Sequence, residues 1–128
     1  MGQGTATAGW KKLAEKLGLA GDVRWMGALM HERALEEMAK GDVLAFTSLQ
    51  EGTPHVVLEA LSLGLPVVCH DCCGMHVVVT EQCGIKVAMK DPQASIEGFA
   101  AAIRKLVGTE GLIESMSRGA LVRRRSGC

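Results

Sequence analysis

Two glutamates lie near the middle of the chain, where an apolar strand pattern gives way to a helix pattern. Glu51 follows the apolar run 42–47. Glu59 comes after seven intervening residues, inside a helix pattern that opens with Thr53 and Pro54. Threonine is a favoured helix cap, and proline fits the first helical position. Backbone N–H groups at such a helix start can bind phosphate, and carboxylates accept paired hydrogen bonds from sugar hydroxyls. The spacing fits a sugar or nucleotide site, and it equally fits two solvated carboxylates at a helix end.

A second group of residues combines thiol and imidazole side chains over a short stretch. Its members are Cys69, His70, Cys72, Cys73, His76 and Cys83. The spacing between Cys69 and Cys72 is typical of zinc ligands, and Cys83 or His76 would complete a tetrahedral set. Against zinc, Cys69 closes an apolar strand pattern, where free cysteine commonly packs as a small hydrophobic side chain. We expect no metal here, with zinc as the alternative.

Composition excludes several functional classes. The chain of 128 residues has 14 Lys and Arg against 14 Asp and Glu, so no basic excess is available to neutralise a nucleic-acid backbone. Aromatic residues make up only 3%, which argues against base stacking. The sequence has no apolar run long enough for a transmembrane segment and no pattern of a secretory signal. Its five cysteines are not spaced as a disulfide framework, which favours a cytoplasmic location.

Short apolar segments alternate with amphipathic segments along the chain. The predicted strands are residues 22–27, 42–47, 66–69 and 84–88. The predicted helices are residues 8–18, 32–40, 53–63 and 92–106, with a last one from about residue 110 and a tail over 118–128. This alternation indicates parallel βαβ units. We therefore expect one α/β domain over residues 1–128, a Rossmann-like parallel sheet flanked by helices.

The two glutamates belong to a longer ordered pattern. Ser48 precedes them, residues 64–68 follow them, and residues 23–27 and 41–47 lie upstream. In this order the segments resemble the C-terminal, donor-binding half of the retaining GT-B glycosyltransferases of family 4, the glycosyl transferases group 1. The resemblance covers nearly the whole chain, from a glycine turn at its start to about residue 116.

The resemblance implies a role for each matching residue. Glu51, the implied catalytic residue, would hydrogen-bond the donor hexose, and Glu59 would hold the ribose hydroxyls of the nucleotide. The implied donor-binding residues are Gly2, Gly4, Glu51, Gly52, Thr53, Pro54, His55 and Glu59. His55 is then more consistent with lining the donor loop than with acting as a catalytic base. The implied reaction transfers a hexose from a nucleoside diphosphate sugar with retention of configuration, without a metal or other cofactor.

We expect this chain to lack parts that the family has. An N-terminal domain binds the acceptor there, and a strand before the glycine turn lies at the centre of the sheet, between the strands around Val23 and Val67. We expect a donor domain truncated at its N-terminal end, without that first strand and inactive alone. Open sheet edges would then favour a strand-swapped dimer, and Cys128 offers a disulfide-linked one. The alternative is a stand-alone, non-catalytic module that binds a nucleotide or a partner.

Overall fold

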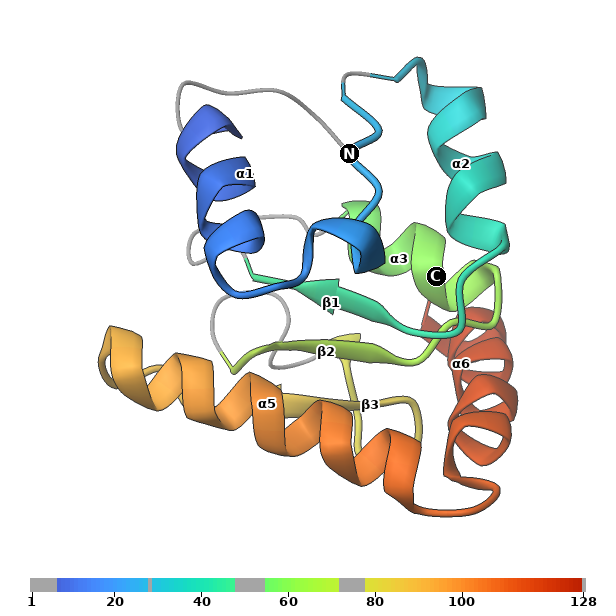
Figure 1. Ribbon diagram of the computed structural model, residues 1–128. Helices are drawn as coiled ribbons and strands as arrows, with labels where there is room; N and C mark the ends of the chain where they lie inside the picture. The colour runs from blue at the N-terminus through green and yellow to red at the C-terminus, as the bar shows by residue number, and fades with distance from the viewer. Residues whose placement is uncertain (1–6, 28, 48–54, 72–77, 128) are drawn as a thin grey trace. The chain divides into compact units, whose positions relative to one another are not determined.

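The computed structural model describes residues 7–27, 29–47, 55–71 and 78–127. The chain divides into two compact units, Met1–Glu36 and Glu37–Cys128. The single domain expected over residues 1–128 stays a prediction. The larger unit contains the sheet and is the one that positions a candidate site (Figure 1).

The first unit is helical in its described residues. Its elements are α1 (Thr7–Lys16), η1 (Ala20–Asp22) and the beginning of α2 (His31–Ala39). The strand predicted at residues 22–27 is wrong, because Asp22 ends η1 and residues 23–27 have no regular secondary structure. A strand needs hydrogen-bonded neighbours to be stable, and no described residue pairs with this segment.

A parallel sheet forms the centre of the second unit. Its strands, in spatial order, are β1 (Leu44–Phe46), β2 (Val67–His70) and β3 (Gly84–Val87). Val67 lies opposite Leu44 on one side and opposite Gly84 on the other. Every residue of β2 is buried, as expected of a strand covered on both faces. The predicted α/β class with a parallel sheet is confirmed.

Helices cover both faces of this sheet. They are α3 (His55–Ser62), α5 (Pro92–Gly108) and α6 (Leu112–Gly127). Successive side chains of a strand point to opposite faces. Accordingly Val67 and Cys69 pack with α3 and α6, whereas Val68 packs with α5, which runs along β2 and β3 in Figure 1. None of the described helices is both long and apolar enough to cross a membrane.

Helix α6 replaces the tail expected over residues 118–128. It continues to Gly127, and Ala120 is completely buried in the core that α3 helps to form. At Gly119 a Cβ atom would overlap the carbonyl oxygen of Gln82, in the turn before β3. The absence of a side chain at this position therefore allows the helix to approach that turn closely.

Strand β1 is an edge of the sheet among the described residues. Because β1 pairs directly with β2, the expected place of a missing strand, between the strands around Val23 and Val67, is wrong. No described residue pairs with the other side of β1. Along this strand Ala45 is exposed, whereas Leu44 and Phe46 are half-buried.

Candidate functional site at the carboxyl edge of the sheet

Helix α3 carries two of the predicted donor-binding residues. His55 is exposed and Glu59 is half-buried, and they lie one helical turn apart, on one face of the helix. The opposite face packs into the core through Val57, Ala60 and Leu61, which are all buried. Core packing thus orients α3 so that His55 and Glu59 lie on the face away from the buried residues, and neither is among the described residues that line the hollow at the carboxyl edge.

The remaining predicted donor residues lie outside the described residues. They are Gly2, Gly4, Glu51, Gly52, Thr53 and Pro54. The turn that would join Glu51 to Glu59 therefore stays a prediction, as does the catalytic role of Glu51. Cys128, expected to link two copies, also lies outside the described residues.

A hollow of about 760 Å³ opens at the carboxyl ends of the strands. Its described lining residues are Thr47, His70, Met89, Lys90, Asp91, Pro92, Ser95, Ile96 and Phe99. Thr47 directly follows β1, His70 ends β2, and residues 89–91 connect β3 to α5. Parallel α/β sheets bind their ligands beyond the carboxyl ends of the strands, because loops and helix starts gather there. The hollow is in the place where the fold predicts a site.

His70 is the buried polar side chain of this hollow. Only 3% of the residue is exposed, its Nε2 atom lies 2.9 Å from the Ser95 hydroxyl oxygen, and its ring meets Phe99 edge-to-face at 5.0 Å. Its Nδ1 atom is buried and has no hydrogen-bond partner among the described residues. A buried polar atom without a partner costs free energy, so it favours a partner supplied from outside. The sequence alone indicates His70 only as a candidate zinc ligand. Its contact with Ser95, which lies 25 positions further along the chain, cannot be predicted from local spacing.

The start of α5 forms one wall of the hollow. Asp91 caps the helix, its carboxylate accepting a hydrogen bond of 2.7 Å from the backbone N–H of Ala94, and Pro92 occupies the first turn. The helix begins at Pro92, as the sequence predicts, and the Asp91 cap is a finding of the structure. The cap holds the first turn in place, and Ser95 in the next turn reaches His70.

The buried cysteines are part of the core. Cys69 and Cys83 are both fully buried, and the Cys83 thiol accepts a 3.4 Å hydrogen bond from the backbone N–H of Thr80. The described residues contain no group of three or more His, Cys, Asp or Glu that could hold a metal ion. Cys72, Cys73 and His76 lie outside them, so the zinc alternative over the full set is untested.

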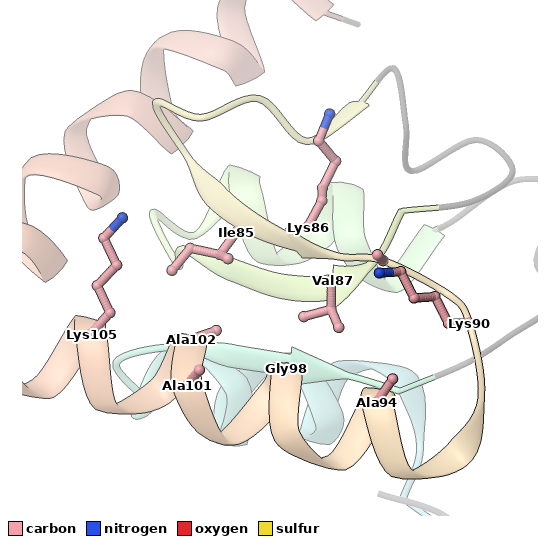
Figure 2. Close-up of a pocket in the computed structure, with 10 residues that line it drawn as sticks. Ile85, Lys86, Val87, Lys90, Ala94, Gly98, Ala101, Ala102 and Lys105 are labelled. Atoms are coloured by element: carbon pink, nitrogen blue, oxygen red, sulfur yellow. The ribbon is translucent and has the colours of Figure 1, made fainter.

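A second, smaller groove of about 370 Å³ lies between β3 and α5 (Figure 2). Small residues of α5 line it, and Gly98 allows the helix to approach the strand, since a Cβ there would overlap the Val87 side chain. Three lysines also line it, namely Lys86, Lys90 and Lys105. Lys90 also lines the larger hollow, so positive charge is available beside the carboxyl edge.

Comparison with known proteins assigns the family. The family model described as glycosyl transferases group 1 matches residues 1–121. The chain belongs to this family. The resemblance noted in the sequence is thereby confirmed.

Two curated glycosyltransferases match much of the chain. Lipopolysaccharide glucosyltransferase WaaG from Escherichia coli (strain K12) is 35% identical over 80 residues, which are 62% of this chain and 21% of that protein. D-inositol 3-phosphate glycosyltransferase from Streptomyces griseus is 31% identical over 119 residues, which are 92% of this chain and 24% of that protein.

A solved structure confirms the fold. The crystal structure of WaaG, a glycosyltransferase involved in lipopolysaccharide biosynthesis, matches with a TM-score of 0.82 and 28% identity over 98% of this chain. The chain covers 32% of that protein in the structural match. It therefore has the fold of one part of a GT-B glycosyltransferase.

Proposed function

We propose that this chain is the part of a retaining glycosyltransferase that binds the nucleoside diphosphate sugar. The observation that carries the proposal is the family match over residues 1–121, in a fold whose carboxyl edge holds a hollow beside the start of α5. The family match does not favour a stand-alone binding module. The reaction would pass a hexose from the donor to an acceptor, with retention at the anomeric carbon.

Glu59 would hold the ribose of the nucleotide. Its half-buried position on the outward face of α3 supports this role, because core packing of the helix limits where the carboxylate can point. A carboxylate can accept hydrogen bonds from two adjacent hydroxyls at once. Glu51 would contact the hexose as the catalytic residue, and His55 would line the donor loop.

Backbone groups would bind the remaining parts of the donor. We propose that residues 52–55 approach the sugar and the diphosphate at the start of α3, where unpaired N–H groups and the helix dipole favour an anion. Gly2 and Gly4 would face the diphosphate from the other side. No metal or other cofactor is part of this proposal.

The acceptor would be bound by another part of the polypeptide. The chain spans between 21% and 32% of the relatives and the solved structure described above. Transfer requires donor and acceptor to be held in one geometry, which greatly accelerates a two-substrate reaction. We propose that this chain binds donor but does not turn it over alone.

Calorimetric titration with UDP, GDP, ADP and their sugar conjugates tests the proposal. We expect Glu59→Ala to weaken binding of every nucleoside diphosphate that binds by about tenfold or more, since a charged hydrogen-bond acceptor is lost. Glu51→Ala should weaken only the sugar conjugates. Glu114→Ala, which removes an exposed carboxylate from the first turn of α6, is the matched control. Equal affinities in all variants would contradict the assigned roles.

A further inference from the structure

Helix α5 has an exposed apolar stripe. Ile96, Ile103 and Val107 are 64%, 43% and 76% exposed, and Ala100 lies between them. Their spacing of four, three and four positions places all four residues along one line of the helix. The stripe runs almost the whole length of α5, so it is a continuous surface rather than a scatter of single residues.

The stripe is distinct from the two faces of α5 that are already in use. Ala102 and Leu106 are buried in the core against the sheet. Ala94, Gly98 and Ala101 line the groove beside β3, as Figure 2 shows. At 100° per residue the stripe lies about a quarter-turn from the buried face and faces away from the groove. Core packing therefore does not explain its apolar residues.

Charged residues border the stripe in an ordered way. Glu97 follows Ile96 in the N-terminal half of α5, and Arg104 follows Ile103 in the C-terminal half. Both are exposed and lie seven positions apart, on the same side of the stripe. Each half of the helix therefore has one charged residue beside the stripe, acidic in the N-terminal half and basic in the C-terminal half.

We propose that this stripe is an interface with a second copy of the chain, in which the two α5 helices pack antiparallel with the two-fold axis between Ala100 and Ile103. In that arrangement Ile96 of one copy meets Val107 of the other, and Ala100 meets Ile103. Glu97 of each copy comes next to Arg104 of the other, so the charge pair forms twice. A parallel two-fold arrangement would place the charged residues of the two copies on opposite flanks of the interface, so these pairs would not form. Such self-complementarity is what a two-fold interface requires.

The dimer is expected to be weak. One helix face per copy buries less surface than the roughly 800 Å² per partner of a standard stable interface. The monomer and dimer should therefore exchange over the micromolar concentration range. This interface does not use the sheet edge or Cys128. It shares Ile96 with the lining of the carboxyl-edge hollow.

Sedimentation velocity of the whole chain under reducing conditions, over a concentration series, tests the interface. We expect reversible dimerisation, and we expect Val107→Asp to weaken it by about tenfold or more, because a charge would be buried without a partner. Val122→Asp is the matched control, since Val122 is also a largely exposed valine (58%), on α6. Circular dichroism reports whether both variants remain folded. A chain that stays monomeric, or a dimer that Val107→Asp does not weaken, overturns the proposal.

Charge exchange tests the antiparallel orientation. Glu97→Arg and Arg104→Glu should each weaken dimerisation several-fold, and the double variant should restore it, because the pairs form again with their signs reversed. A double variant no better than the single variants would overturn the proposed orientation. A strand-swapped dimer would not respond to any of these substitutions, so that result would also count against α5.

Discussion

Gly119 offers a direct test of how α6 packs. In the structure a Cβ at this position overlaps the backbone carbonyl of Gln82. The neighbouring carbonyl of Cys83 accepts a 3.1 Å hydrogen bond from the N–H of Val67, so movement of this turn would disturb the pairing of β2 with β3. Crowding of a packed core typically costs about 1–3 kcal/mol. Against this cost, alanine stabilises a helix interior by about 1 kcal/mol relative to glycine. We expect Gly119→Ala to lower the free energy of unfolding by about 1 kcal/mol or more, since backbone must move.

The matched variant is Gly108→Ala at the end of α5, where no atom lies within 4 Å of an added Cβ. There the helix-propensity gain is not opposed, so we expect stability to be unchanged or to rise by up to about 1 kcal/mol. Urea unfolding followed by circular dichroism measures both variants. If Gly119→Ala stabilises the protein as much as Gly108→Ala does, residues 118–127 do not pack as the structure indicates, and the expected tail would be the better description.

Two further predictions concern the helix that borders the carboxyl-edge hollow. Ser95→Ala should lower the free energy of unfolding by about 1–2 kcal/mol, because it leaves the Nε2 atom of buried His70 without its hydroxyl partner. Urea unfolding measures this change. A loss below about 0.5 kcal/mol would contradict the hydrogen bond. Leu106→Ala should lower the free energy of unfolding by about 2–5 kcal/mol, since Leu106 is almost fully buried against the sheet. Val107→Ala should lower it little, because Val107 is exposed. Similar losses of stability at both positions would contradict the assigned faces of α5.

Local patterns were sufficient to predict the central elements of the larger unit. Three of the four predicted strands overlap β1, β2 and β3, because short, nearly continuous apolar runs are what a parallel sheet covered on both faces requires. The start of α5 at Pro92 is also predicted correctly, since proline fits the first position of a helix. The ordered pattern around Glu51 and Glu59 was specific enough to indicate the family, which the match over residues 1–121 confirms.

The errors all concern partners that are distant along the chain. Residues 23–27 have the composition of a strand, yet a strand exists only where a neighbour pairs with it, and none of the described residues does so. The order of the sheet could not be predicted from local pattern either. As a result, the missing strand was placed beside Val67, where β1 pairs instead.

The sequence by itself determined the alternation of strands and helices, the family and the spacing of the two glutamates, since each depends on residues close together along the chain. Only the tertiary structure decided that His70 meets Ser95, that Ala120 is buried by α3, and that one face of α5 stays exposed. These outcomes depend on which surfaces the folded backbone brings together. Burial and hydrogen bonding between distant segments cannot be predicted from the spacing of residues that are close together in the sequence.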